Sequence, residues 1–369
     1  MNPFGLGIAS RDRFCNRAAE IDQLSRNMLS GIHTVVYAPR RYGKSSLARR
    51  VLADLEPGMT GVYVDLFSIT TADDAAEKMY RSIVNALGRG AADKNSLASR
   101  ITSFFKRLRL SLEFDQALGT PEFSVSLGDA AAEIHLESVI ANLDDYCAAN
   151  GIKVCLVLDE FQEICNLKES KKIEALLRGG MQAAQNVSFM MLGSRRMILR
   201  DMFEDRKRPF YKSAYVMKLS PMPGDEFADY LIRQFAAGEL ILSREEAGQI
   251  IAFTEAYPYY TQKLAMLYFD MKRPGASVVE AQQFLVEMES ADCENIFVGL
   301  TNHQKRLLQA IAVSHPASIF ATVFLTTHRL GSQGGIQSSL AKLKKLDLVE
   351  QDDVGWRVTD PIFCKWLAQ

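Results

Sequence analysis

The chain lacks any long apolar run, any marked excess of one charge and any close pairing of its cysteines. No apolar stretch approaches the length of a membrane span and the N-terminus lacks a secretory signal pattern, so we expect a cytoplasmic protein without membrane contact. The net charge of −1 at pH 7 excludes a generally basic nucleic-acid binder, so any such contact must be local. The six cysteines show no C-x-x-C spacing and the five histidines no ligand spacing, which disfavours disulfides and metals other than magnesium.

Residues 38–46 read A-P-R-R-Y-G-K-S-S, between an apolar run and a helical pattern. A strand-to-helix turn that ends in Gly-Lys-Ser directs backbone N–H groups and a helix N-terminus at a polyphosphate. Ala38 replaces the first glycine of the usual G-x-x-x-x-G-K-[ST] pattern, and alanine is the smallest side chain that could stand there. Lys44 would reach the outer phosphates and Ser45 would hold magnesium. We expect the loop to bind nucleotide through Pro39, Arg40, Arg41, Tyr42, Gly43, Lys44, Ser45 and Ser46.

A second motif supports nucleotide binding, because the Gly-Lys-Ser triplet alone would also fit a surface turn. Residues 154–158 form a continuous apolar run, typical of a buried central strand, and end in Asp159-Glu160. At the carboxyl end of such a strand Asp159 can hold magnesium through Ser45 or water. Glu160 is then placed to polarise the attacking water. The apolar run 187–192 ends near Ser194, which we expect to contact the γ-phosphate or its water.

The pattern of elements predicts three domains, since 369 residues are too many for one ordinary core. Up to residue 222, strands and helices alternate, which predicts a mostly parallel sheet with the nucleotide at its carboxyl edge. Within this domain, about residues 88–132 form an irregular insertion with a hairpin-like pattern at 112–114 and 123–127. The insertion either binds a partner or packs on its own domain, and the second is favoured. Residues 223–298 read as a helical lid, and 299–369 as three helices closed by a β-hairpin, the winged-helix arrangement.

Short motifs occur along nearly the whole chain: Asn2-Pro3-Phe4, Phe14 with Arg17 and Glu20, the phosphate loop, Leu158 to Gln162, Gly193-Ser194, Pro209 to Tyr211, Leu219 to Met222, and Tyr257 to Tyr260. As a set they resemble the archaeal-type ATPases within the STAND class of AAA-like P-loop proteins, which are related to origin-recognition ATPases. The resemblance implies an α/β P-loop NTPase sheet with a helical lid and a C-terminal winged helix. It also implies that the backbone near Phe4 and Phe14, together with Arg17 and Pro258, lines the base and phosphate pocket.

AAA-like ATPases complete a neighbouring subunit's site with an arginine just before the final strand, because a guanidinium neutralises charge on the γ-phosphate. Many relatives have Gly-Arg after the Pro-x-Tyr motif, where this chain has Lys212-Ser213. Arg208 is the first candidate for this role, with Arg195 and Arg206 behind it. A solvated basic loop is the alternative interpretation.

The winged helix has two candidate partners. Its third helix carries side chains that can meet phosphates and base edges in a major groove. Aspartates surround that helix and the wing tip is acidic, so DNA and protein are equal alternatives. The polar residues of the helix are Gln333, Gln337, Ser338, Lys342, Lys344 and Lys345, and the aspartates are Asp347, Asp352 and Asp353.

These observations predict an ATPase of the STAND or AAA type that uses ATP and Mg²⁺, hydrolyses slowly, and repositions its lid and winged helix with nucleotide state. Hydrolysis would be an in-line attack of water on the γ-phosphate, with Lys44 and magnesium balancing charge and Glu160 orienting the water. One alternative is an ATP-gated DNA-binding regulator or loader. Another is a nucleotide-binding scaffold without turnover. A monomer and a homo-oligomer both fit the sequence.

Overall fold

The computed structural model describes residues 2–7, 14–15, 17–88, 111–115, 122–126 and 132–369. Its contacts divide the chain into two compact units. Unit 1 comprises residues 1–16, 39–43 and 220–369, and unit 2 comprises residues 17–38 and 44–219. Within the described ranges, no helix has both the length and the hydrophobicity that a bilayer span requires.

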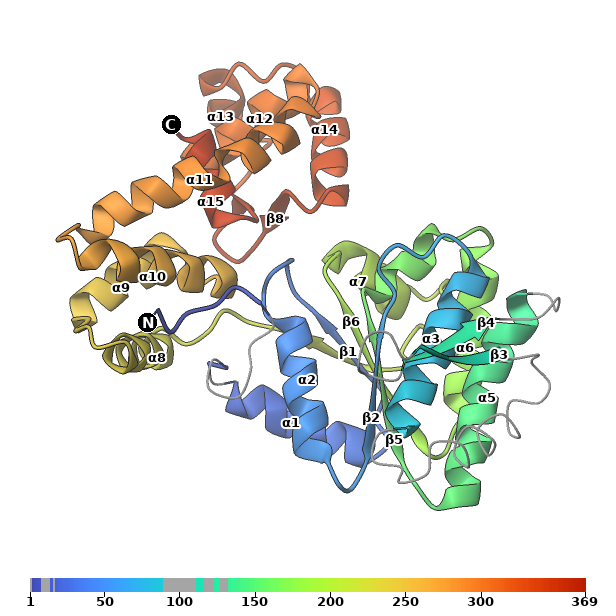
Figure 1. The fold of residues 1–369 in the computed structure, drawn as a ribbon. Coiled ribbons are helices and arrows are strands. Elements are labelled where there is room, and N and C mark those ends of the chain that lie inside the picture. The colour runs from blue at the N-terminus through green and yellow to red at the C-terminus, as the bar shows by residue number, and fades with distance from the viewer. Residues whose placement is uncertain (1, 8–13, 16, 89–110, 116–121, 127–131) are drawn as a thin grey trace. The chain divides into compact units, whose positions relative to one another are not determined.

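A five-stranded sheet forms the centre of unit 2 (Figure 1). The order is β2-β5-β6-β1-β7, and every neighbouring pair is parallel, as the alternation of strands and helices predicted. Because the strands are parallel, their carboxyl ends share one edge, where Asp65 lies opposite Asp159 and Tyr37 opposite Gly193. The strands are β1 (Thr34–Tyr37), β2 (Thr60–Asp65), β5 (Val154–Asp159), β6 (Val187–Gly193) and β7 (Tyr215–Lys218).

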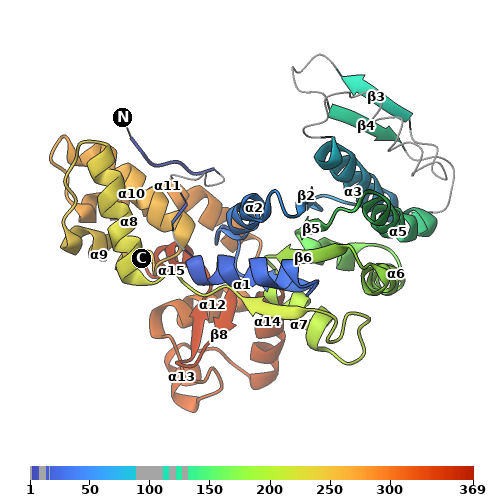
Figure 2. The ribbon, with the colours of Figure 1, turned by 90° about the horizontal axis from the view of Figure 1, so that it is seen from below.

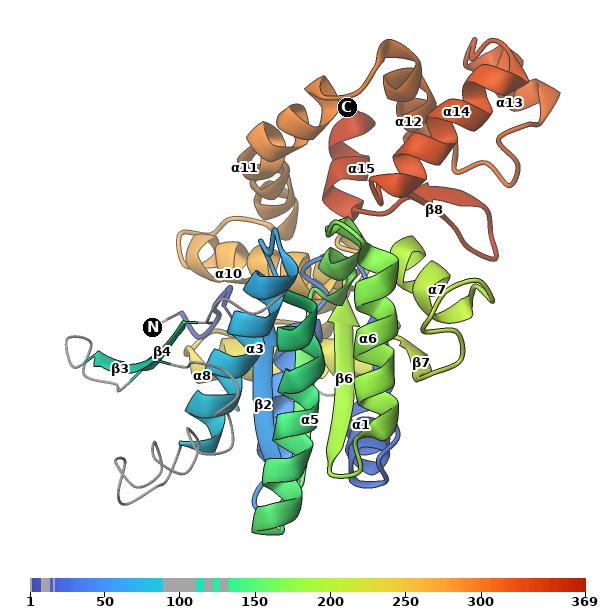
Figure 3. The same ribbon diagram turned by 90° about the vertical axis from the view of Figure 1, so that its right-hand side faces the viewer.

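Helices cover both faces of this sheet. Helices α1 and α2 pack together on one face, and α3, α5 and α6 lie side by side on the other (Figures 2 and 3). Every residue of β5 and β6 is buried, which is why their sequences are continuous apolar runs rather than alternating ones. The helices are α1 (Ala18–Leu29), α2 (Lys44–Leu55), α3 (Ala72–Leu87), α5 (Ala132–Asn150), the short 3₁₀ helix η2 (Phe161–Asn166), α6 (Ser170–Ala183) and α7 (Arg196–Glu204).

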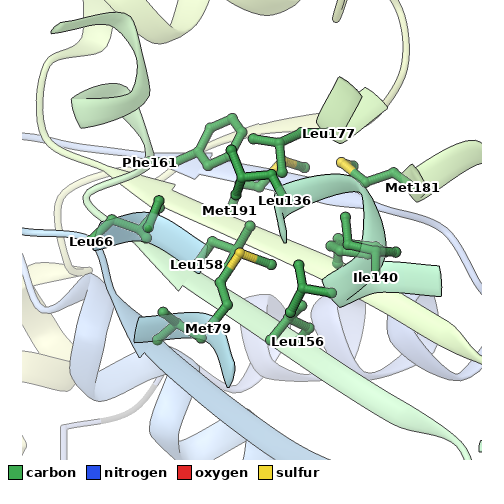
Figure 4. Packing of buried hydrophobic residues seen from close by; sticks show 14 of the residues in the cluster. Leu66, Met79, Leu136, Ile140, Leu156, Leu158, Phe161, Leu177, Met181 and Met191 are labelled. Atoms are coloured by element: carbon green, nitrogen blue, oxygen red, sulfur yellow. The ribbon is translucent and has the colours of Figure 1, made fainter. Parts of the chain in front are cut away.

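A large hydrophobic core of unit 2 lies between the sheet and helices α3, α5 and α6. Figure 4 shows Leu156 and Leu158 of β5 facing side chains from all three helices. Phe161, directly after the catalytic candidate Glu160, points into the same layer and is fully buried. This packing fixes the end of β5, where the predicted acidic residues stand, against the rest of the domain.

The predicted hairpin is present within the insertion. Strands β3 (Ser111–Asp115) and β4 (Glu122–Ser126) pair antiparallel, with Leu112 opposite Val125. Residues 89–110, 116–121 and 127–131 of the predicted insertion lie outside the described residues.

Unit 1 contains the lid helices and the winged helix. Capping boxes at Ser243, Ser277 and Thr301 begin α9, α11 and α12, because each serine or threonine accepts from the N3 amide and the N3 side chain accepts in return. The predicted three helices and hairpin are followed by a further helix, α15, capped by Asp360. The elements are α8 (Gly224–Ala237), α9 (Arg244–Phe253), α10 (Pro258–Lys272), α11 (Val278–Val298), α12 (Asn302–Ser314), α13 (Thr322–Thr327), α14 (Gln333–Lys345), β8 (Val349–Gln351), β9 (Trp356–Val358) and α15 (Pro361–Leu367).

Candidate functional site

The loop between β1 and α2 has the backbone that its sequence requires. Gly43 has a φ of +84°, a left-handed conformation that glycine adopts without strain. Ala38 is fully buried and its φ is not positive, so alanine fits where the motif usually has glycine. Lys44 begins α2 and is buried, and its Nζ donates to the Ala38 carbonyl at 3.0 Å. The lysine therefore reaches back across the loop.

The two predicted magnesium ligands are in contact. Ser45 Oγ donates to Asp159 Oδ2 at 2.6 Å, and the Glu160 amide donates to Asp159 Oδ1 at 2.8 Å. Asp159 is 5% exposed, and these hydrogen bonds orient its carboxylate. A hydroxyl and a carboxylate are the hard oxygen donors that Mg²⁺ prefers, so this pair fits the metal that the motifs imply.

Tyr63 of β2 is a member of this cluster that sequence reasoning missed. Its hydroxyl donates to Asp159 Oδ2, the same oxygen that accepts from Ser45. Burial, and then the adjacent Asp159 charge, raises the pKa of Tyr63, which keeps the phenol protonated as a donor. The only sequence signal is alternation, since Val62 and Val64 point into the core and leave Tyr63 on the opposite face.

The two predicted catalytic side chains also meet. Ser194, directly after β6, donates through Oγ to Glu160 Oε2 at 3.0 Å. Glu160 has a φ of +52°, a sparsely populated conformation for a residue with a side chain, and such strain is concentrated at functional sites. The structure thus brings Ser45, Asp159, Glu160 and Ser194 together at the carboxyl edge of one sheet.

Arg208 is engaged within its own chain. Its Nε and Nη2 donate to the two carboxylate oxygens of Glu174, at 3.1 and 2.5 Å, and Nη2 also donates to Cys165 Sγ at 3.1 Å. Glu174 is fully buried. Burial raises the pKa of Glu174, and the Arg208 guanidinium opposes that rise. A trans-acting role for Arg208 stays a prediction, and this geometry weighs against it. Arg206 is exposed and Arg195 is half-buried.

Glu174 was also missed by sequence reasoning, although a signal exists. It lies on the same face of α6 as Leu177 and Met181, which are buried in the core. A carboxylate at an apolar position needs a buried partner, and Arg208 is that partner.

Residues 39–43 of the loop belong to unit 1, where they contact α10 and α11. The Arg41 guanidinium lies 4.4 Å from the centroid of the Tyr259 ring and 3.7 Å from Glu289 Oε2. Tyr42 packs edge-on against Tyr257, with ring centroids 5.0 Å apart. The Tyr257 hydroxyl also donates to a loop carbonyl, that of residue 40. The Tyr-Pro-Tyr-Tyr motif therefore holds the first half of the loop.

The residues expected around the nucleotide base are distributed over both units. Phe4 is buried in unit 1, and its ring packs edge-on against Phe235 of α8 at 5.5 Å. Pro258 begins α10 and is also buried, whereas Phe14 is half-buried. Arg17 belongs to unit 2, where it is buried and has a φ of +73°. Their roles in nucleotide binding stay predictions.

The winged helix presents a polar surface with little free positive charge on its wing. Arg357 of β9 pairs with Glu255, Glu350 and Asp352 at 3.2, 2.6 and 3.2 Å. On α14, Lys342 and four other polar residues are exposed, while Lys344 lies 5.4 Å from the Trp356 ring centroid. The other exposed polar residues of α14 are Gln333, Gln337, Ser338 and Lys345.

Comparison with known proteins supports the C-terminal winged helix. A family model described as "Probable winged helix domain" matches residues 292–369, which confirms the predicted C-terminal winged helix. The match begins inside α11, whereas the sequence predicted a boundary at residue 299. No curated protein sequence matches the chain.

Solved structures share the fold over nearly the whole chain. A Walker-type ATPase of Pyrococcus abyssi superposes with a TM-score of 0.71 and 19% identity, covering 99% of each chain. The ORC2 protein of Aeropyrum pernix, in ADPNP-ADP complexes, has a TM-score of 0.56 and 15% identity, over 95% of this chain and 92% of that one. The ORC1 protein of the same organism, in complex with DNA, has a TM-score of 0.51 and 13% identity, over 98% and 94%.

These likenesses, at low identity, show the fold. Over nearly its whole length the chain shares the fold of these structures, with a parallel sheet, a helical lid and a C-terminal winged helix. The resemblance to archaeal-type and origin-recognition ATPases that the motifs indicated is therefore confirmed in three dimensions.

Proposed function

We propose that the protein binds ATP and Mg²⁺ at residues 38–46 and hydrolyses ATP slowly, as a nucleotide-dependent switch. The observation that carries this proposal is the convergence of two side-chain pairs at one sheet edge. Ser45 and Asp159 are 2.6 Å apart, and Ser194 and Glu160 are 3.0 Å apart. The first pair supplies magnesium ligands and the second supplies a carboxylate and a hydroxyl for the attacking water.

Each side chain has a distinct role in this reaction. Lys44 neutralises charge on the outer phosphates, and Ser194, whose hydroxyl proton is donated to Glu160, accepts a hydrogen bond from the attacking water. Glu160 orients the water for in-line attack and accepts its proton. Magnesium, held by Ser45 and by Asp159 directly or through water, would balance the phosphate charge.

The contacts of the loop with the lid segment support a switching role. The Arg41 guanidinium lies over the Tyr259 ring, and the Tyr42 ring packs against Tyr257. Nucleotide bound to the loop would therefore act on the helices that hold it.

Binding is tested with Lys44→Ala, and Lys153→Ala serves as the control because Lys153 is exposed outside the site. Removing the buried ammonium should weaken ATP binding by at least about a hundredfold, since charge-assisted phosphate contacts are strong. Fluorescence titration with a labelled ATP analogue measures the change. Unchanged binding to a folded Lys44→Ala protein would refute the phosphate-loop assignment.

Chemistry is tested separately with Glu160→Gln, and Glu163→Gln in the 3₁₀ helix that follows Glu160 is the control. An amide keeps the shape of Glu160 but cannot accept a proton, so turnover should fall at least about tenfold while ATP binding is kept. Phosphate release under saturating ATP gives the rate. A parent protein that binds ATP and releases no phosphate would be a nucleotide-binding scaffold.

ATP-gated DNA binding is the second candidate, and the exposed Lys342 and Lys345 on α14 favour it. The wing opposes it, because Arg357 is paired with acidic residues and Asp352 and Asp353 are exposed. Retention on duplex DNA that falls steeply with salt would support a DNA partner. If duplex DNA is not retained at low salt, with or without ATP, a DNA partner is excluded and a protein partner for the winged helix is favoured.

A further inference from the structure

Gln162 lies two residues after Glu160, and the reaction described above gives it no role. Its side chain is fully buried in η2. The amide Nε2 donates to Glu160 Oε2 and lies 3.5 Å from Ser194 Oγ. Gln162 therefore forms a triangle with the two predicted catalytic side chains, which come from the ends of two adjacent strands, β5 and β6.

The hydrogen bonds of this triangle fall on one oxygen of Glu160. Oε2 accepts from both Gln162 and Ser194, whereas no hydrogen bond from the described part of the chain reaches Oε1. The backbone of Glu160 is held separately, because its amide donates to Asp159 Oδ1 at 2.8 Å. One carboxylate oxygen is thus fixed by the protein, and the other is left to meet a water molecule.

Gly193, the last residue of β6, makes room for Gln162. A Cβ at this position would lie 2.1 Å from Gln162 Oε1 and 2.5 Å from Leu199 Cδ1. The φ of Gly193 is not positive, so the backbone itself does not call for glycine. The close approach of the Gln162 side chain explains the glycine.

Packing alone does not explain why residue 162 is a glutamine. Its Oε1 is buried and has no hydrogen-bond partner among the described residues, which costs free energy that an apolar side chain of similar size would avoid. The hydrogen bond that Nε2 donates to Glu160 offsets this cost. The amide is therefore present for its contact with the carboxylate.

We propose that Gln162 is a positioning residue that, together with Ser194, holds the Glu160 carboxylate with Oε1 directed at the attacking water, and that Gly193 provides the space it needs. This inference rests on the proposed ATPase function and adds to it a residue that acts through Glu160. Two donors fix the carboxylate, where Ser194 alone would leave it free to rotate about one hydrogen bond.

The first test is Gln162→Leu, with Gln182→Leu on the exposed surface of α6 as its control. Turnover at saturating ATP should fall about tenfold, because a mispositioned Glu160 would lose part of its contribution as a general base. The affinity for a labelled ATP analogue should not change. The melting temperature should not fall, because leucine suits a buried position.

The second test is Gln162→Met, which keeps the unbranched length of the side chain and removes the amide donor. Its turnover should also fall about tenfold with nucleotide affinity unchanged, because both variants lose the same donation to Glu160. A purely structural residue would give a loss of melting temperature and of nucleotide affinity together.

The outcomes separate this inference from the proposed function. If the parent binds ATP and turns it over, but Gln162→Leu or Gln162→Met has the parent rate, the positioning role is refuted and the ATPase proposal stands. If the parent itself has no turnover, both proposals are refuted. Should Gln162→Leu fail to fold, the turnover of Gln162→Met decides.

Discussion

Replacing Arg208 with alanine should destabilise unit 2, because it leaves a carboxylate buried without its counter-charge. Glu174 is fully buried, and Arg208 donates to both of its carboxylate oxygens, at 3.1 and 2.5 Å. The Arg208 side chain is 21% exposed, so the pair is only slightly screened by solvent. Removing one partner of a buried pair costs about 3–5 kcal/mol, and the partial exposure of Arg208 favours the lower end, about 3 kcal/mol.

The stability that Arg208→Ala loses should depend on pH, and the direction of that dependence identifies Glu174 as its cause. Burial raises the pKa of Glu174 from its model-compound value of 4.5, and Arg208 opposes the rise, so Arg208→Ala should raise this pKa further. A carboxyl whose pKa is higher in the folded state contributes stability below the unfolded pKa and loses it as the pH rises through the folded pKa. The deficit of Arg208→Ala should therefore be small near pH 4 and grow as the pH rises above about 4.5.

Urea unfolding followed by far-UV circular dichroism, at several pH values, measures this deficit. Both tryptophans, Trp356 and Trp366, lie in the winged helix, so their fluorescence does not report directly on unit 2. Hydrogen exchange in α6 would assign the loss to the segment that carries Glu174. Arg206→Ala is the matched control, because Arg206 is exposed.

The result that would refute this reasoning is equally specific. If Arg208→Ala unfolds at the parent urea concentration at every pH but loses turnover, Arg208 is not needed to neutralise Glu174, and a role at a neighbouring subunit's site is favoured. A double replacement, Glu174→Leu with Arg208→Met, should recover most of the stability, because apolar residues of similar volume can replace a buried ion pair.

Three further predictions concern other parts of the molecule. Tyr63→Phe removes a donor to Asp159 and should raise the Mg²⁺ concentration for half-maximal binding of a labelled nucleotide roughly tenfold, as loss of an outer-shell partner does; an unchanged titration would make Tyr63 a packing residue. Tyr260→Phe removes the 2.7 Å hydrogen bond to the half-buried Asp360 of the winged helix and should destabilise unit 1 by about 1.5–3 kcal/mol, seen in tryptophan fluorescence. If a second copy of the chain supplies an arginine to the site, the ATPase rate per chain should rise with protein concentration. A rate per chain that stays constant on dilution, with a monomer mass throughout, would exclude such a shared site.

The sequence by itself determined the turn between β1 and α2, the acidic end of β5 and the C-terminal winged helix. These features are local. Gly43 permits a left-handed backbone, the continuous apolar runs at β5 and β6 match strands buried on both faces, and the helices of unit 1 begin at capping residues such as Ser277. A local pattern is readable because the chemistry that produces it lies within a few residues of the chain.

Only the tertiary structure decided which distant side chains meet. The parallel pairing of β2 with β5 brings the Tyr63 hydroxyl to Asp159, and the pairing of β5 with β6 brings Gln162 to Gly193. The contact between Arg208 and Glu174 likewise joins a loop after α7 to the buried face of α6. Strand order and register set these contacts. Both arise from the collective burial of the core rather than from any short segment. The sequence could therefore name the residues of the predicted phosphate loop, but not the side chains that hold Asp159 and Glu160 in place.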